Sequence, residues 1–278
     1  MSRLIIFLLC LFLTPFNLHA FQKTYYISIV PMYAPGLILN YYSPLIDYVK
    51  KETKTNWELR YYHTHKDLVR GFCNKEIDIA FSGPVPFALA KKDCSAKELI
   101  VALNSDGRPY YNSVIFTSNR GIKFLKDLQD KKFGYVKGST LAHVVPFKML
   151  EDAGIKVQPV AFKRHEEIIK AVLSGEIAAG GVKESLFKKF SSQSNIFMIE
   201  RSQDIPNFIF FAQGDIDKNV AKEFIKALIK LKPLQNPKHR EITSTWDDEA
   251  KNGFIMPTKE YLQKLSLIAD WTNRYIKD

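Results

Sequence analysis

Short apolar runs and longer amphipathic stretches alternate along the chain, and their order predicts its elements. Runs of β-branched and aromatic residues indicate strands, whereas apolar residues three and four positions apart indicate helices. In the first part of the chain, the predicted strands are 25–30, 57–62, 77–81, 98–103 and 113–117, and the predicted helices are 41–52, 65–74 and 85–91. Strands that alternate with helices are typical of a mainly parallel sheet covered by helices on both faces, so an α/β fold is expected.

The same alternation starts again after residue 120 and predicts a second lobe. Its predicted elements are helices at 124–129, 140–152 and 165–173, a short helix ending at Phe190, and strands at 132–136, 158–162, 177–182 and 197–200. A strand at 207–211 and helices at 218–231 and 258–276 close the chain. We expect lobe 1 to contain 21–117 plus 208–278 and lobe 2 to contain 118–207, with crossovers near Ser118 and Phe208. Ligands of α/β proteins bind at the carboxyl ends of parallel strands, so a ligand cleft is expected between the lobes.

The N-terminus has the pattern of a secretory signal peptide. Arg3 precedes an apolar run at 4–13, which is followed by Pro15 and by the small residue Ala20. This pattern predicts removal of residues 1–20, with cleavage after Ala20, and a periplasmic mature protein. A lipid anchor on Cys10 is not expected, because that processing needs a small residue before the cysteine.

Composition narrows the class of protein. The chain has 278 residues, of which 46% are hydrophobic and 25% charged, which excludes a disordered chain, a fibre and a small disulfide scaffold. Because its net charge is +11, candidate partners are nucleic acid, anionic membranes and small anions. The basic residues are scattered in short pairs without a zinc, helix-turn-helix or RNA-binding signature, so no nucleic-acid partner is expected. We expect a monomer that binds a small anion.

Two cysteines, Cys73 and Cys94, remain once the predicted signal peptide is removed. An oxidising compartment permits one intramolecular pairing between them, so a disulfide is expected, with two buried thiols as the alternative. No metal site is expected.

The sharpest chemical feature is a glycine turn followed by a hydroxyl pair at a predicted helix start, Gly138, Ser139 and Thr140. The first N–H groups of a helix have no intrahelical partners and attract anions, and the two hydroxyls can donate beside them. The alternative is that Ser139 is only a helix N-cap. The lysine of a Walker A loop is absent.

Two further positions follow the same logic. Ser82 precedes a helix start in the first lobe, with a turn or cap residue as the alternative. His165 opens the next helix of the second lobe and is a candidate ligand donor, with an exposed histidine on a charged helix as the alternative.

The ordered set of motifs resembles the phosphonate-binding-protein family of ABC transporters, which bind phosphate, phosphite or phosphonate. The motifs are DIAFSGP at 78–84, DGRPYYNSV at 106–114, LKDL at 125–128, GST at 138–140, His165 and LSGE at 173–176. The resemblance runs from about residue 25 to 261.

This resemblance implies a type II periplasmic-binding-protein fold whose two lobes close on an oxyanion and deliver it to an inner-membrane permease. It implies that Ser139, Thr140 and His165 hold the oxyanion, that Ser82 contributes from lobe 1, and that the loop with Tyr33 faces the ligand. Tyr111 is a candidate for lining the organic side of the site, with an ordinary core aromatic as the alternative. No cofactor is implied.

The sequence departs from the family pattern after the predicted strand 177–182, where many relatives have Asp or Asn and this chain has Lys183 and Glu184. Glu184 would suit the amino group of an aminophosphonate, whereas Lys183 would favour phosphate, phosphite or a simple alkylphosphonate. The alternative is that both are exposed at a helix start.

Two other functions use the same residues. Ser139, His143 and His165 could form a hydrolase site, but no Gly-x-Ser-x-Gly motif surrounds Ser139. A periplasmic sensor that closes on an oxyanion and signals to a membrane kinase would have the same cleft.

Overall fold

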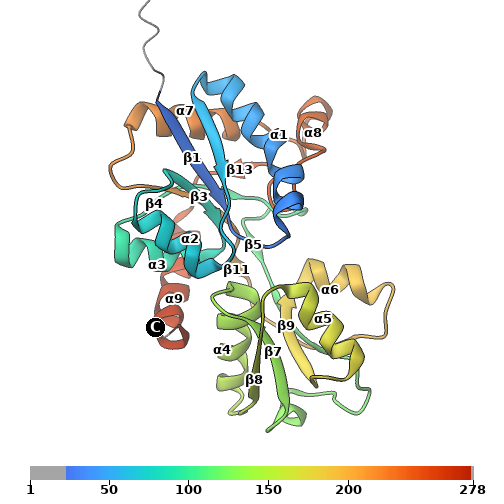
Figure 1. Ribbon diagram of the computed structural model, residues 1–278. Helices are drawn as coiled ribbons and strands as arrows, with labels where there is room; N and C mark the ends of the chain where they lie inside the picture. Colours follow the sequence, from blue (N-terminus) through green and yellow to red (C-terminus); the bar gives the residue numbers. More distant parts are fainter. Residues whose placement is uncertain (1–22, 277–278) are drawn as a thin grey trace, which may run out of the picture.

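The computed structural model describes residues 23–276 (Figure 1). The predicted signal peptide, 1–20, with its cleavage site after Ala20, lies outside the described residues. Within them, the strands form a six-stranded sheet, a five-stranded sheet and a two-stranded ribbon. None of the described helices is both long and apolar enough to cross a membrane.

The six-stranded sheet is the centre of lobe 1, and its strand order is β13-β4-β12-β3-β1-β2. β1 pairs in parallel with β2 and β3, whereas β12 is antiparallel to both β3 and β4. The mainly parallel sheet expected from the sequence is therefore mixed, because the chain returns from lobe 2 in the opposite direction. Its strands are β1 (Thr24–Ile29), β2 (Asn56–Arg60), β3 (Ile79–Ser82), β4 (Lys97–Ala102), β12 (Ile209–Ala212) and β13 (Phe254–Ile255).

Helices cover both faces of this sheet. α1 and α7 pack together over one face, and α2, α3 and α9 lie over the other. α1 begins six residues earlier than predicted, because Pro35 occupies its first turn, where a missing N–H has no consequence. The lobe 1 helices are α1 (Pro35–Thr53), α2 (His65–Cys73), α3 (Pro84–Cys94), α7 (Lys218–Ile229), α8 (Pro237–Thr243) and α9 (Lys259–Tyr275).

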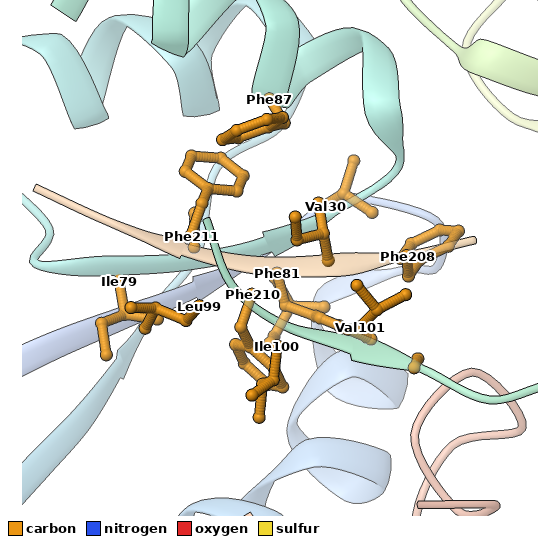
Figure 2. Packing of buried hydrophobic residues seen from close by; sticks show 14 of the residues in the cluster. Val30, Ile79, Phe81, Phe87, Leu99, Ile100, Val101, Phe208, Phe210 and Phe211 are labelled. Carbon is orange, nitrogen blue, oxygen red and sulfur yellow. The ribbon is translucent and has the colours of Figure 1, made fainter. Parts of the chain in front are cut away.

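Aromatic side chains fill the lobe 1 core on both sides of the sheet (Figure 2). Phe210 stacks on Phe81 with ring centroids 4.3 Å apart, whereas its neighbour Phe211 projects to the opposite face and contacts Phe87 at 5.2 Å. This alternation follows from the two-residue period of a strand. β12 therefore joins the two layers of the lobe, although it comes from the far end of the chain.

Lobe 2 is built on the five-stranded sheet, with strand order β10-β6-β9-β7-β8. β7 is parallel to β8 and β9, and β6 is antiparallel to β9 and β10. α5 and α6 pack on one face of the sheet, and α4 packs on the other. The elements are β6 (Ser113–Thr117), the 3-10 turn η1 (Leu125–Leu128), β7 (Lys132–Val136), the π-helical turn η2 (Thr140–Val144), α4 (Val145–Asp152), β8 (Gln158–Phe162), α5 (His165–Ser174), β9 (Ala179–Lys183), α6 (Glu184–Ser191) and β10 (Phe197–Arg201).

The two crossovers between the lobes are paired with each other. β5 (Tyr110–Tyr111) and β11 (Ile205–Pro206) form an antiparallel ribbon between the two sheets. The sequence division placed the first crossover near Ser118, but β6 already belongs to the second sheet, so the chain leaves lobe 1 at the ribbon, before Ser113. The sequence assigned β6 to lobe 1 because strand periodicity does not reveal which sheet a strand joins.

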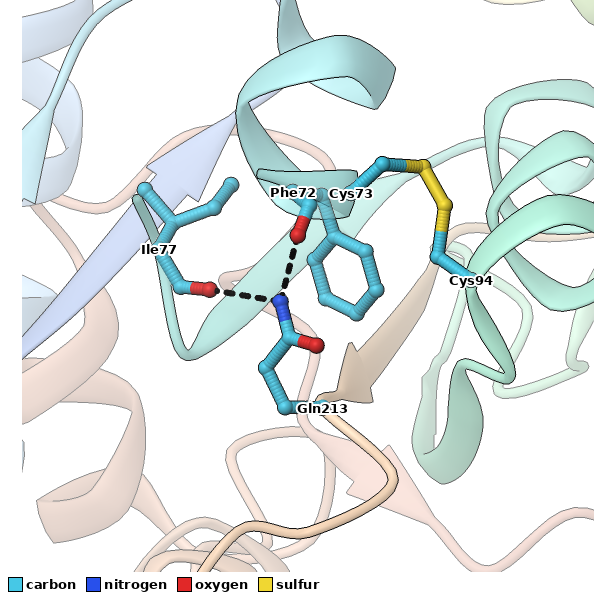
Figure 3. The surroundings of a disulfide bond; sticks show 5 residues. All are labelled: Phe72, Cys73, Ile77, Cys94 and Gln213. Carbon is cyan, nitrogen blue, oxygen red and sulfur yellow. Dashed lines mark hydrogen bonds between the residues drawn. A yellow bond between two sulfur atoms is a disulfide. The ribbon is translucent and has the colours of Figure 1, made fainter. Parts of the chain in front are cut away.

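A disulfide joins Cys73 and Cys94, with Cα atoms 5.2 Å apart (Figure 3). These are the last residues of α2 and α3, so the bridge ties the C-terminal ends of two neighbouring helices. Beside it, the buried Gln213 donates hydrogen bonds to the carbonyls of Phe72 and Ile77 and fixes the turn after α2.

Candidate ligand-binding site

A cleft of about 340 Å³ lies between the lobes. The carboxyl ends of strands from both sheets open into it: the segments after β1, β2 and β3 in lobe 1, and after β7, β8 and β9 in lobe 2. Ligand sites of α/β sheets form at such edges. The polar residues and tyrosines that line the cleft are Tyr33, His65, Tyr111, Ser139, Thr140, His165, Glu166, Lys183, Ser185, Lys189, Asp248 and Glu249.

The lobe 2 wall is the helix start that the sequence singled out. Ser139 is the N-cap of η2, and its Oγ accepts a hydrogen bond of 3.2 Å from Ala142 N. The same oxygen lies 3.1 Å from His165 Nε2. Ser139 is therefore both a helix cap, as the simpler interpretation held, and a member of the cleft.

A glycine is required directly before this helix start. Gly138 has a φ of +82°, a left-handed conformation that glycine adopts without strain. A Cβ there would also lie 3.1 Å from the Cβ of His65 in lobe 1, so this turn lets the two lobes approach closely.

The lobe 1 wall is the N-terminus of α3, and it contacts the lobe 2 helix start directly. Its N-cap, Gly83, has no side chain to cap the helix. Instead, Val85 N donates a hydrogen bond of 3.0 Å to Thr140 Oγ1 of lobe 2. A Cβ on Gly83 would lie 2.9 Å from the Tyr111 hydroxyl and 3.0 Å from Thr140 Oγ1, so only glycine leaves room for both. Two helix N-termini thus face one small space, which favours an anion.

Two tyrosines, Tyr33 and Tyr111, also line the cleft. Burial raises the pKa of Tyr111 well above its ordinary value, while its hydrogen bond with Thr140 opposes the rise. Burial, followed by the charges of Asp247 and Glu249, also raises the pKa of Tyr33. Both phenols therefore stay protonated and remain hydrogen-bond donors at physiological pH.

Two histidines that line the cleft, His65 and His165, and the buried His143 are electrically neutral at pH 7. The pKa of His65 is lowered to about 3, mainly by burial and then by repulsion from His165 and His143 when those rings are protonated. Burial lowers the pKa of His165 to about 4, with a smaller effect from Lys183. His143 also has a pKa of about 4, owing to burial and then to Lys137, and its Nδ1 accepts a hydrogen bond of 3.3 Å from Gly138 N.

His65 is a cleft residue that the sequence analysis missed. It is the first residue of α2, directly after the segment that follows β2. The rule that identified Ser82 and Ser139, a helix start after a parallel strand, applies equally to His65, and would have found it.

The cleft also holds an ion pair between the lobes. Lys183, at the end of β9, pairs with Glu249, whose side chain is 7% exposed. The ammonium group lies 5.4 Å from the Tyr111 ring and 6.0 Å from the Phe208 ring. Burial raises the pKa of Glu249, and the nearby Lys183 opposes this effect. Lys183 thus faces the cleft, but with its charge matched by a carboxylate.

Glu249 was not foreseen because it lies in the loop after α8, more than sixty residues from its partner. Asp247 fixes this loop: its Oδ1 accepts hydrogen bonds of 2.9 Å from the Tyr42 hydroxyl and from Glu249 N. No local pattern in the sequence marks such a loop as part of a site.

Two of the predicted site residues do not line the cleft. Ser82 is fully buried at the end of β3, and its hydroxyl donates to the carbonyl of Gly83. Glu184 turns away and pairs with Arg201 at 2.9 Å and with Lys188 at 3.0 Å. Glu184 is the first residue of α6, so its side chain follows the helix surface, whereas Lys183 ends the strand and points into the cleft.

The described residues contain no group of three or more His, Cys, Asp or Glu side chains placed to hold a metal ion. What the site offers is hydrogen-bond donors: hydroxyls of Ser139, Thr140 and Tyr111, and backbone N–H groups at two helix starts. Such a set suits an oxyanion.

Solved structures with the same fold include those of three bacterial proteins, each 13–18% identical to this chain. PhnD1 from Prochlorococcus marinus, in complex with methylphosphonate, has a TM-score of 0.76 at 18% identity and covers 91% of this chain and 99% of its own. XAC2383 from Xanthomonas citri, bound to chloride ion, has a TM-score of 0.78 at 13% identity. The match covers 90% of this chain and 98% of the XAC2383 chain. PA3383 from Pseudomonas aeruginosa, a binding protein component of an ABC phosphonate transporter, has a TM-score of 0.75 at 14% identity. The match covers 91% of this chain and 88% of the PA3383 chain. These likenesses confirm the type II periplasmic-binding-protein fold.

Among curated proteins, the phosphate-import protein PhnD of Mycolicibacterium smegmatis is 24% identical over 185 residues. This match covers 61% of the present chain and 58% of that relative's length. The sequence also matches the family described as ABC transporter, phosphonate, periplasmic substrate-binding protein over residues 27–261. The chain therefore belongs to the phosphonate-binding family of periplasmic substrate-binding proteins of ABC transporters.

Proposed function

We propose that this protein binds a phosphorus oxyanion, namely a phosphonate, phosphite or phosphate, between its lobes and delivers it to an inner-membrane permease of an ABC transporter. It acts in the periplasm after removal of residues 1–20, as a monomer and without chemical turnover. The observation that carries the proposal is the meeting of two helix N-termini in one cleft, where Thr140 of lobe 2 already accepts a hydrogen bond from Val85 of lobe 1.

In this proposal, Ser139, Thr140, His165 and Tyr111 donate to the oxyanion, and His65 approaches it from lobe 1. Hydrogen bonds to charged groups contribute about 1.5–3 kcal/mol each, so four such bonds are enough for micromolar binding after the cost of closing the lobes. Curated and structural relatives support the ligand class: one is a phosphate-import protein and one holds methylphosphonate.

Lys183, Asp248 and Glu249 also line the cleft, and their charges affect which organic group the ligand can carry. Glu249 and Asp248 pair with Lys183 and Lys251, so a ligand ammonium group would have to compete with a lysine for either carboxylate. The carboxylate that the sequence analysis assigned to this role, Glu184, lies elsewhere.

A hydrolase is the less favoured function. Ser139 Oγ is within hydrogen-bond distance of His165 Nε2, as a nucleophile and base would be. In residues 23–276, however, no carboxylate is hydrogen-bonded to His165 or His143 to orient it, as a catalytic triad requires.

The test is thermal melting of ligand-stripped protein from Phe21 onward with phosphate, phosphite, methylphosphonate, 2-aminoethylphosphonate and sulfate. A ligand present at one hundred times its dissociation constant adds about 2.7 kcal/mol of stability. We expect a clear melting shift with at least one phosphorus oxyanion, none with sulfate, and no hydrolysis of a chromogenic phosphate ester.

The site assignment is tested with a double variant, Ser139→Ala with Thr140→Ala, which should lose the melting shift. The matched control is Ser191→Ala with Ser192→Ala, which removes two hydroxyls from the end of α6 in the same lobe. Equal shifts in both variants would refute the site, and no shift in the unmodified protein would refute the function.

A further inference from the structure

A second, larger cavity of about 880 Å³ adjoins the cleft and shares Tyr33, His65 and Pro86 with it. It is lined by α2 and the segment before it in lobe 1, and by the segments after β7 and β8 in lobe 2. We call it the basic groove, after its charged lining residues: Lys66, Arg70, Lys137, Lys163, Arg164 and Asp93.

The charge of the basic groove is strongly one-sided. Five lysines and arginines line it, against a single carboxylate, Asp93. Arg70 and Arg164 are paired with acidic neighbours on their own helices, at 2.9 Å and 3.4 Å. Among residues 23–276, the ammonium groups of Lys66, Lys137 and Lys163 have no ion-pair partner.

These three exposed lysines line the basic groove from both lobes. Lys66 belongs to lobe 1, whereas Lys137 and Lys163 belong to lobe 2. Like charges on opposite walls repel, and the repulsion increases as the lobes approach. An anion between the walls would convert this repulsion into attraction. The groove also adjoins the cleft at His65, so one ligand can occupy both spaces.

We propose that the basic groove holds a second anionic phosphorus group of the ligand whose first group binds in the cleft. The ligand class is then a compound with two or more linked phosphoryl or phosphonyl groups. This inference rests on the proposed function, because the cleft must hold the first group. A condensed inorganic phosphate and a nucleoside triphosphate share this chemistry, and the volume of about 880 Å³ leaves room for either.

The experiment is titration calorimetry of the ligand-stripped protein with phosphate, methylphosphonate, pyrophosphate, tripolyphosphate, methylenediphosphonate and ATP. We expect pyrophosphate and methylenediphosphonate to bind at least tenfold more tightly than phosphate and methylphosphonate. Tighter binding of ATP than of tripolyphosphate would identify a nucleoside source, and the reverse order an inorganic one.

The deciding variant is Lys66→Gln with Lys137→Gln and Lys163→Gln. It should lose at least tenfold in affinity for pyrophosphate and less than threefold for phosphate. The control is Lys218→Gln with Lys222→Gln and Lys259→Gln, which makes the same change in net charge at exposed positions of α7 and α9 and should alter neither affinity.

The outcomes separate the two proposals. If phosphate or methylphosphonate binds but linked phosphates gain nothing, or if the deciding variant and the control behave alike, the basic groove is refuted and the proposed function stands. If no phosphorus oxyanion binds, the proposed function fails and this inference fails with it. If only linked phosphates bind, and they depend on the three lysines, the groove is supported and the ligand class of the proposed function is wrong.

Discussion

At the scale of single residues, the protonation of two histidines determines how much positive charge the cleft carries. His65 and His165 are held uncharged by burial, with pKa values of about 3 and about 4, although both are placed to meet an anion. Among the described residues, no carboxylate acts to raise the pKa of either ring. An oxyanion would supply a negative charge, so ligand binding and proton binding should be linked at this site.

The first prediction is that the ligand-free protein loses stability as the pH falls from about 7 to about 4. The unfolded histidines, with an ordinary pKa near 6.5, bind protons in this window while the folded ones do not, so lower pH favours unfolding. His165→Gln should reduce the difference in unfolding free energy between pH 7 and pH 5 by roughly 1 to 2 kcal/mol, because it removes one such group. Urea unfolding at the two pH values measures this.

A control for this prediction is His239→Gln, which changes a partly exposed histidine on α8 that does not line the cleft. The prediction is contradicted if both substitutions change the pH dependence equally.

At the scale of elements, α2 and α3 present the two lobe 1 helix starts to the cleft, with His65 and Gly83 at their N-terminal ends. The disulfide joins their opposite ends through Cys73 and Cys94. The bridge therefore fixes the far ends of two helices whose N-terminal residues line the cleft, and Cys73 itself lines the basic groove.

The second prediction concerns this bridge. Cys73→Ala with Cys94→Ala should lower the free energy of unfolding by about 3 kcal/mol, because the bridge closes a loop of about twenty residues in the unfolded chain. Urea unfolding of the oxidised protein and of the variant measures the difference. A reducing agent should destabilise the unmodified protein by the same amount and leave the variant unchanged; stability that is insensitive to both would contradict the prediction.

Sequence patterns predicted most of these elements but fewer of the contacts between them. The strands and helices that border the cleft begin or end within a few residues of their predicted positions, because period-two and helical spacing report on local burial. β5, β11 and β13 were missed, because two-residue strands carry no period. The short helix α8 was also missed.

Cleft residues that directly follow a predicted strand could be predicted from the sequence. Cleft residues that come from a distant loop could not. Ser139, Thr140 and His165 follow strands of the second lobe, and the sequence placed all three in the cleft. Glu249 reaches it through a loop that only the tertiary fold brings near Lys183. The sequence could not separate Lys183 from Glu184, because their different directions depend on where β9 ends and α6 begins.

At the scale of the whole molecule, contacts between the lobes occur on two sides. Within the cleft, Lys183 pairs with Glu249 and Val85 bonds to Thr140. Outside it, Arg274 and Tyr275, at the end of α9, contact Glu151 on α4 (Figure 1). The described structure is therefore one in which the lobes are close together.

The third prediction is that Lys183→Met separates the lobes in the ligand-free protein. Removing one member of a buried ion pair costs about 3–5 kcal/mol, because the other charge is left without a partner. Opening the cleft lets water reach Glu249 and relieves that cost, so the equilibrium should shift toward the open form by a hundredfold or more. Small-angle X-ray scattering should show a larger radius of gyration.

Lys183→Met combined with Glu249→Met tests the cause, because it removes both charges. This double variant should return to the radius of gyration of the unmodified protein. Identical scattering from the single variant, the double variant and the unmodified protein would show that the ion pair does not control closure.

The pairing of β5 with β11 has a consequence for how a ligand is reported to other proteins. Two separate strands would let the lobes twist, slide and tilt independently, whereas a hydrogen-bonded ribbon restricts them mainly to rotation about one axis. Ligands of different chemistry then differ in their effect on the protein mainly through the angle between the lobes that each one stabilises. Any receptor that touches both lobes can measure that angle without contacting the ligand, and two ligands that produce the same angle would be indistinguishable to it.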